Sequence, residues 1–173
     1  MTSNNVYVKK IDFLKEKVLN YIKFKNVSFE RMINSIDDTF EQLDTKAQEK
    51  YEVFFNELTS LIEKDKEEEY QLNDFRECFN KTIYSYFVST ILLSSEYINH
   101  MDLATKLNIS KTQLSNVMKI IISFKLVESC KIGKKKYYYI TPKGREFNRF
   151  VNNDKKYVLI LKEKKNYKKL VNG

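Results

Sequence analysis

Hydrophobic residues recur at spacings of three and four through the first part of the chain, a pattern typical of amphipathic helices. Ile11, Leu14 and Val18 mark a first helix over about residues 6–25, and Ser28 can cap a second one. The same rhythm continues to Ile62, and no glycine or proline occurs before Gly133. The pattern therefore predicts a long helical region, whose apolar face can bury against a copy of itself.

Three further helices are predicted between residues 74 and 124. Asp74–Ser95 is strongly apolar and is expected to form a single helix. Asn99 can cap a short helix that buries Leu103, Ala104 and Leu107. Ser110 followed by Gln113 matches a capping box, which starts a helix over 110–124. Two short helices joined by a tight turn are typical of a helix-turn-helix.

The stretch that follows predicts a β-hairpin. It holds two of the three glycines and the only proline of the chain. Gly133-Lys134 suits a two-residue type II′ turn, which pairs Val127 with Ile140 and gives a wing over 127–140. Tyr138 then shares the buried face with Ile140. Thr141 and Pro142 are suited to begin the next helix as its N-cap and first position.

These elements predict a mainly α protein with a small β-wing. The expected architecture is a winged helix-turn-helix core preceded by a long helical extension. The expected domains are a helical extension over 1–70 for dimerisation or partner binding, a winged helix-turn-helix over 71–151, and a basic C-terminal helix or tail over 152–173. The charged stretch Lys64–Tyr70 is the expected boundary of the extension.

The net charge of +8 is distributed unevenly. Residues 1–99 hold 13 Lys and Arg against 18 Asp and Glu, a net charge of −5, whereas residues 100–173 hold 18 against 5, a net charge of +13. So large a surplus of positive charge indicates a polyanionic partner. Nucleic acid is the first candidate, and an acidic membrane surface is the second.

Enzyme classes find little support in the residue inventory. His100 is the only histidine, and the three glycines do not form a phosphate-binding loop. Cys78 and Cys130 are isolated and are expected to be reduced thiols. We therefore expect no catalytic residues, no metal and no cofactor. No apolar run approaches a membrane span, and the N-terminus shows no secretion signal, so a cytoplasmic protein is expected.

The chain resembles the winged helix-turn-helix proteins, and more narrowly the MarR-type transcription regulators. The resemblance is carried by the segment MDLATKLNISKTQLSNVMKIIISFKLVES, by the hairpin and by YYYITPKGREF. Four short segments match the pattern of that family: Leu103-Ala104, Ser110–Thr112, Leu126-Val127 and Thr141–Gly144. Lys125 stands where the family usually has glycine, and the wing has lysines where an Asp-x-Arg pattern is common. The resemblance implies a dimeric bacterial regulator.

In such folds the second helix of the motif lies in the major groove with its first residues on base edges. The expected base contacts are Thr112, Gln113, Ser115 and Asn116, because amides and hydroxyls can read donor and acceptor patterns. The expected backbone contacts are Ser110, Lys111, Lys119, Lys131, Lys134, Lys135, Lys136 and Lys143.

The sequence thus predicts a dimeric, sequence-specific double-stranded DNA-binding protein that regulates transcription. The 110–124 helix would read the major groove, and the wing would contact the backbone or minor groove. The homodimer would form through the N-terminal helices, with the C-terminal helix as a second candidate interface. No membrane partner is expected, and no residue set identifies an effector. The alternative is a winged-helix assembly, replication or plasmid-maintenance protein whose acidic helical half binds a protein partner.

Overall fold

The structure, a computed structural model, describes residues 3–171, with side chains described over 6–164. The chain divides into two compact units, unit 1 over Met1–Leu72 and unit 2 over Asn73–Gly173. The division falls inside helix α3 (Thr45–Lys81), and the charged stretch Lys64–Tyr70 is helical throughout.

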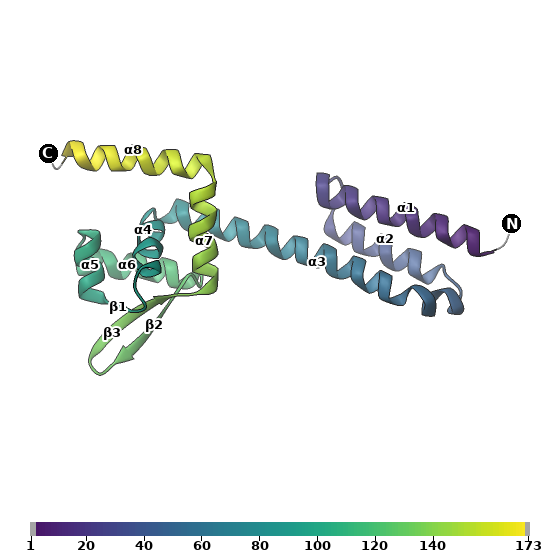
Figure 1. The fold of residues 1–173 in the computed structure, drawn as a ribbon, viewed down its shortest axis with the longest axis horizontal. Coiled ribbons are helices and arrows are strands. Elements are labelled where there is room, and N and C mark those ends of the chain that lie inside the picture. The colour runs from purple at the N-terminus through teal and green to yellow at the C-terminus, as the bar shows by residue number, and fades with distance from the viewer. Residues whose placement is uncertain (1–2, 172–173) are drawn as a thin grey trace. The chain divides into compact units, whose positions relative to one another are not determined.

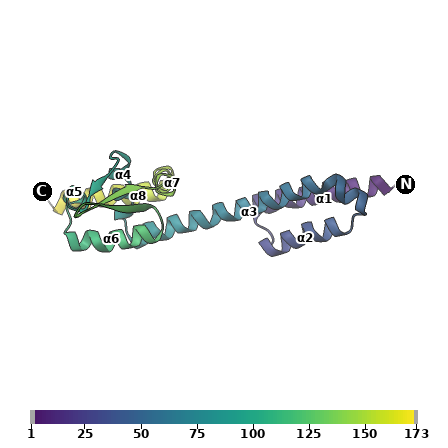
Figure 2. The ribbon, with the colours of Figure 1, turned by 90° about the horizontal axis from the view of Figure 1, so that it is seen from below.

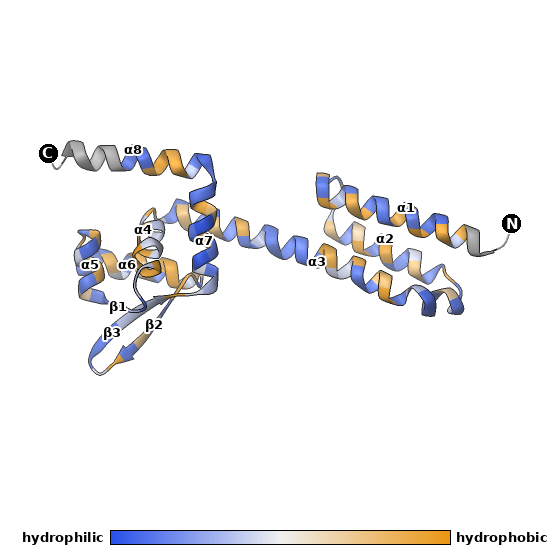
Figure 3. Cartoon of the chain, in the orientation of Figure 1, coloured by the Kyte–Doolittle hydropathy of each residue, from blue (hydrophilic) through white to orange (hydrophobic). Residues whose placement is uncertain are grey.

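Unit 1 consists of helices α1 (Ser3–Phe24), α2 (Phe29–Glu41) and the first part of α3 (Figure 1). Ser28 caps α2, as predicted, because its side chain accepts a hydrogen bond from the Arg31 N–H. The Asp44 carboxylate does the same for Ala47 N–H at 2.9 Å at the start of α3. Apolar and polar residues alternate along these helices (Figure 3), and the apolar ones form a core around Val18, Ile36 and Ile62.

Unit 2 follows with the order helix, strand, two helices, two strands and two helices (Figure 1). After the end of α3 these are α4 (Tyr84–Leu93), β1 (Ile98–Asn99), α5 (His100–Leu107), α6 (Lys111–Ser123), β2 (Val127–Ile132), β3 (Lys135–Ile140), α7 (Pro142–Asn153) and α8 (Lys155–Val171). The strands form an antiparallel sheet in the order β1-β3-β2. This order confirms the predicted fold class, a mainly α chain with a β-wing.

The hairpin has the predicted register, with Val127 opposite Ile140 and Ile132 opposite Lys135. Gly133 takes φ +61° at the first turn position, where glycine has no Cβ to resist a left-handed backbone. Tyr138 and Ile140 are buried together. Thr141 caps α7 through its hydroxyl, which accepts from the Gly144 N–H at 3.0 Å, and Pro142 occupies the first turn.

The prediction of a single helix over Asp74–Ser95 is wrong, because α3 ends at Lys81 and α4 begins at Tyr84. Phe79 and Val88 are both buried in one core. They are nine residues apart, about two and a half turns, so a straight helix would place them on opposite sides. The Ser85 N–H instead bonds to the Thr82 carbonyl at 3.1 Å in a tight turn, which redirects the chain and lets both side chains reach the core.

Lys125 occupies a left-handed backbone position at φ +58°, just after α6. The N–H of Lys125 bonds to the Ile122 carbonyl at 2.9 Å, and the N–H of Leu126 bonds to that of Ile121 at 3.2 Å, so α6 ends in a turn that glycine suits best. The place where the resembled family has glycine is thus one where the backbone favours it.

We expect Lys125→Gly to raise the free energy of unfolding by roughly 0.5–1 kcal/mol. Relief of the left-handed strain contributes about 1–2 kcal/mol, and the greater freedom of glycine in the unfolded chain offsets about 0.4–1 kcal/mol of it. Denaturant titration of both proteins measures the difference. Lys119→Gly, inside α6, is the control and should be destabilising; a Lys125→Gly protein that is equally destabilised contradicts the argument.

Helix α8 packs against the rest of unit 2 through its first two turns. The Tyr157 ring lies 4.6 Å from that of Phe79 and 5.4 Å from that of Phe150, and Leu161 is buried in the same core. Among the helices of the described residues, none has the length and apolarity that crossing a membrane requires.

Candidate nucleic-acid interface

Helices α5 and α6 form the helix-turn-helix. Asn99 caps α5 as predicted, since its side chain accepts from the Asp102 N–H, and α5 ends at Asn108 with φ +53°. The predicted capping box starts α6: the Ser110 hydroxyl accepts from Gln113 N–H at 3.1 Å, and Gln113 Oε1 accepts from Ser110 N–H at 3.0 Å. The start of α6 is therefore fixed by its own hydrogen bonds. Figure 2 shows α5 and α6 as ribbons from a second side.

The two helices pack against each other through a continuous hydrophobic core. Its members on α5 and α6 are Leu103, Ala104, Leu107, Leu114, Val117, Met118 and Ile121, all buried. Burial of this face leaves the opposite face of α6 to solvent. Thr112, Asn116 and Lys119 follow one another at spacings of four and three on that face, and all three are exposed.

Gln113 and Ser115, also exposed, have hydrogen-bonding partners within the protein. The Oε1 atom of Gln113 is engaged in the capping box, although an adenine contact uses both the oxygen and the nitrogen of an amide. The Ser115 hydroxyl donates to the Lys111 carbonyl at 3.0 Å. Asn116 is thus the amide on this face that can present both its oxygen and its nitrogen to a base without breaking the cap.

His100 links helix α6 to the wing, a role that its position in the sequence does not reveal. Its Nδ1 lies 2.9 Å from the Tyr138 hydroxyl on β3, and its Nε2 lies 3.2 Å from the Lys111 carbonyl on α6. A carbonyl only accepts, so Nε2 carries the hydrogen and Nδ1 accepts from Tyr138. Burial raises the pKa of the Tyr138 hydroxyl, which therefore remains a donor at neutral pH.

Strand β1 adds a second connection between the helix-turn-helix and the wing. Ile98 pairs with Tyr138 and Asn99 with Tyr137, so the residue that caps α5 is also paired with the hairpin. This strand could not be predicted from the sequence, because two residues are too short to show an alternating pattern. Strand β1 and His100 together orient the wing relative to α6.

The lysines of the wing are exposed and close together. Lys131 pairs directly with Lys136 across the strands, and Lys134 and Lys135 lie at and next to the turn. Like charges placed opposite one another are unfavourable in a sheet. An anion bound against the hairpin would relieve this repulsion. In Figure 1 the hairpin projects from the helices of unit 2, which leaves its tip accessible.

Lys143 is the predicted backbone contact that the structure places in an ion pair. Its Nζ lies 2.6 Å from Asp74 Oδ2, and its side chain is only 28% exposed. Ser110, Lys111 and Lys119, in contrast, are exposed at or on α6. A phosphate would have to compete with Asp74 for Lys143, whereas it would meet no described ion pair at Lys111 or Lys119.

The two cysteines are free. Burial raises the pKa of the Cys78 thiol to about 11, so this thiol stays protonated at neutral pH and behaves as part of the core. The described part of the chain has no group of three or more His, Cys, Asp or Glu side chains placed to hold a metal ion.

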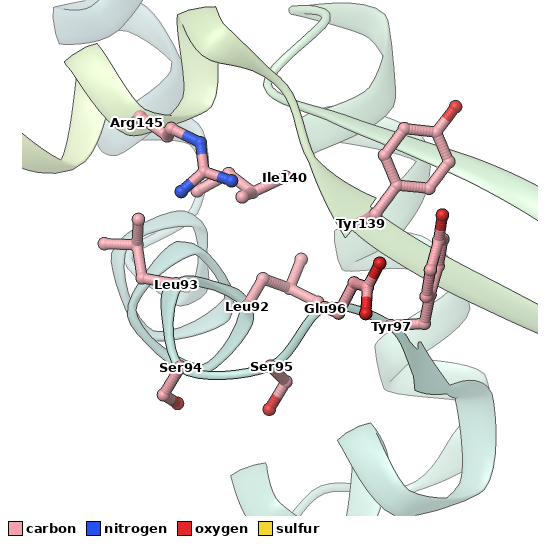
Figure 4. A pocket seen from close by; sticks show the side chains of 9 residues that line it. All are labelled: Leu92, Leu93, Ser94, Ser95, Glu96, Tyr97, Tyr139, Ile140 and Arg145. Carbon is pink, nitrogen blue, oxygen red and sulfur yellow. The ribbon is translucent and has the colours of Figure 1, made fainter.

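A cavity of about 420 Å³ lies beside the wing, between the end of α4, strand β3 and the first turns of α7 (Figure 4). Figure 4 shows Arg145 near Ile140 and Leu93, and Glu96 next to Tyr97. The Tyr97 and Tyr139 rings are 5.8 Å apart. None of the predicted DNA-contact residues lines this cavity.

Unit 2 is a winged helix-turn-helix, as the order and register of its elements show. No family model matches the chain, and no curated protein matches it. The solved structures similar to it include MarR-family transcription regulators. At 14–19% identity these likenesses concern the fold alone.

The sequence identity, coverage and TM-score of three of these structures are as follows. NadR in complex with 4-hydroxyphenylacetate is 18% identical over 61% of this chain and 81% of its own, with a TM-score of 0.40. A possible transcriptional regulator for arsenical resistance is 19% identical over 54% of this chain and 94% of its own, at 0.36. The oxidized form of MarR from E. coli is 14% identical over 60% of this chain and 88% of its own, at 0.38.

Proposed function

We propose that this chain is a dimeric, sequence-specific double-stranded DNA-binding protein that regulates transcription. The observation that carries the proposal is the outer face of α6. Thr112, Asn116 and Lys119 form an exposed polar row on a helix whose start is fixed by a capping box. The basic hairpin lies in the same compact unit.

In the proposed complex α6 lies in the major groove. Asn116 donates to and accepts from an adenine edge, and Thr112 contacts a neighbouring base or phosphate. Lys111 and Lys119 bind phosphates on either side of the groove. Lys131, Lys134, Lys135 and Lys136 bring the wing to the backbone or the minor groove. The net charge of +13 on residues 100–173 is then balanced by the phosphates of the DNA.

The DNA-binding part of the proposal is tested by competition between duplexes. Full-length protein bound to a labelled duplex from upstream of its own reading frame is challenged with an unlabelled scrambled duplex of equal composition. The proposal expects the scrambled duplex to compete at least about tenfold less well than the native one. Equal competition by both duplexes contradicts sequence-specific recognition.

The homodimer part rests on apolar side chains that unit 1 leaves exposed. Phe13 and Phe24 on α1 are 60% and 62% exposed, and Val53 on α3 is 71% exposed. Val6, Phe13 and Phe24 lie along one side of α1, away from the residues that it buries in unit 1. Exposed aromatic residues of this kind commonly mark an interface. By contrast, Tyr157 and Leu161 of α8 are already used within unit 2.

We expect the full-length chain to sediment as a dimer at micromolar concentration. Phe13→Ser combined with Phe24→Ser should weaken dimerisation at least about tenfold, because two aromatic anchors are lost. Lys9→Ser combined with Lys23→Ser, on the same helix, is the control for a surface change without loss of apolar area. A parent chain that stays monomeric at 100 micromolar, about the weakest range for a functional dimer, would rule out this interface.

A further inference from the structure

A second cavity, of about 350 Å³, lies in unit 1 between α1 and α2. Lys17 and Asn20 line it from α1, Asn26 from the connecting loop, and Arg31 and Ser35 from α2. Val27 and the buried Met32 supply its apolar part. The DNA-binding proposal uses none of these residues.

The cavity is cationic although it lies in the acidic half of the chain. Residues 1–72 hold 11 Lys and Arg against 15 Asp and Glu, a net charge of −4, yet α1 alone holds five lysines against two acidic residues. No carboxylate lines the cavity. The two cations that do line it, Lys17 and Arg31, come from different helices.

Neither of these two cations forms an ion pair with a described carboxylate. Other cations of the same unit do: Lys25 pairs with Asp65, and Lys66 lies 3.8 Å from Glu30. The interaction that Lys17 makes among the described residues is with an aromatic ring, its Nζ lying 4.8 Å from the Phe13 ring centre. The Asn20 and Asn26 amides make no hydrogen bond to the described side chains or backbone, so their donors are also available.

Lys17 and Arg31, the two charged residues that line this cavity, are both hydrogen-bond donors, and two neutral amides add further donors. A guanidinium matches two oxygens of a phosphate at once, and an ammonium adds a point charge. The volume corresponds to about a dozen waters at roughly 30 Å³ each, which is more than a phosphate ion needs. The remaining space borders Val27 and Met32.

We propose that this cavity binds a small ligand that carries a phosphate group. Arg31 from α2 and Lys17 from α1 hold the phosphate, and Asn20 and Asn26 donate to its remaining oxygens. An apolar or aromatic part of the ligand packs on Val27 and Met32. The site belongs to unit 1, so it adds a binding function to the unit that the DNA-binding proposal uses only for dimerisation.

The test uses phenyl phosphate and inorganic phosphate as probes, titrated at constant ionic strength into the ¹⁵N-labelled full-length chain and followed by amide chemical shifts. We expect saturable shifts at α1 and α2 with both probes and tighter binding of phenyl phosphate. Lys17→Gln combined with Arg31→Gln should weaken binding at least about tenfold. Lys15→Gln, an exposed lysine of α1 outside the cavity, is the matched control and should leave binding unchanged.

Both substituted side chains are exposed, so the variants should fold, which their thermal midpoints verify. Equal weakening by Lys15→Gln and by the double variant, or shifts that do not saturate, would overturn the proposal. A duplex DNA arm separates the two sources of phosphate. If the double variant keeps its affinity for DNA while losing phenyl phosphate, the ligand is a free small molecule. If it loses DNA instead, the cavity holds a backbone phosphate and the small-ligand proposal is wrong.

Discussion

Gly144→Ala is expected to lower the free energy of unfolding of unit 2 by about 3 kcal/mol or more. Gly144 is buried in the first turn of α7, and a Cβ there would lie 2.1 Å from the Leu126 carbonyl oxygen and 2.8 Å from Ile140 Cγ1. The carbonyl is backbone and cannot rotate away. It also accepts hydrogen bonds from the N–H and the hydroxyl of Thr141, both at 3.1 Å, so a shift would break the start of α7.

Gly133→Ala is the matched control for this prediction. A Cβ on Gly133 meets nothing within 4 Å, and only the left-handed φ of +61° opposes the substitution. The expected cost is about 1–2 kcal/mol, the usual strain of a left-handed residue. Denaturant unfolding monitored by far-ultraviolet circular dichroism measures both variants. Equal stabilities of the two variants would show that α7 does not pack against Leu126 as closely as described.

Asn116→Ala is expected to reduce the preference for the native duplex over a scrambled one roughly ten- to hundredfold. A bidentate amide contact to a base contributes about 1–3 kcal/mol of discrimination, and Asn116 is exposed on the outer face of α6 with no competing cap. Gln113→Ala is the control on the same helix. It removes one half of the capping box, so we expect a loss of about 0.5–1 kcal/mol in stability and a smaller loss of preference.

The same binding assay separates the helix from the wing. Replacing Lys134, Lys135 and Lys136 by Gln should weaken binding to both duplexes equally and leave their ratio unchanged. If each lysine neutralises one phosphate, the slope of log affinity against log salt becomes shallower by about 2.7. An unchanged slope would show that the wing does not touch the backbone, and a preference that survives Asn116→Ala would place base recognition elsewhere.

Local sequence signals predicted those parts of unit 2 that depend on neighbouring residues. Gly133 set the position of the hairpin turn, and the two-residue loop then fixed the register of Val127 with Ile140. The Ser110–Gln113 capping box set the start of α6. Each of these features needs only a few consecutive residues and a known backbone preference.

The remaining features depend on contacts between distant residues, which a local pattern does not contain. The break at Thr82–Ile83 arises because Phe79 and Val88 must reach one core. The hydrogen bond from Tyr138 to His100 joins residues 38 positions apart. The ion pair of Lys143 joins it to Asp74, 69 positions earlier in the chain. In the candidate site, the residue types of α6 could be read from the sequence, but their availability to a base depends on the hydrogen bonds that they already make within the protein.

The central claim is sequence-specific binding to duplex DNA, and fluorescence anisotropy tests it most directly. The two probes are the duplex upstream of the reading frame of the protein and a scrambled duplex of equal composition. The affinity for each is measured across a salt series. The account predicts at least about tenfold tighter binding of the native duplex, about 1.4 kcal/mol, with the preference retained as salt rises. Equal affinities that fall together with salt would contradict it and would leave unit 2 as a general binder of nucleic-acid backbone.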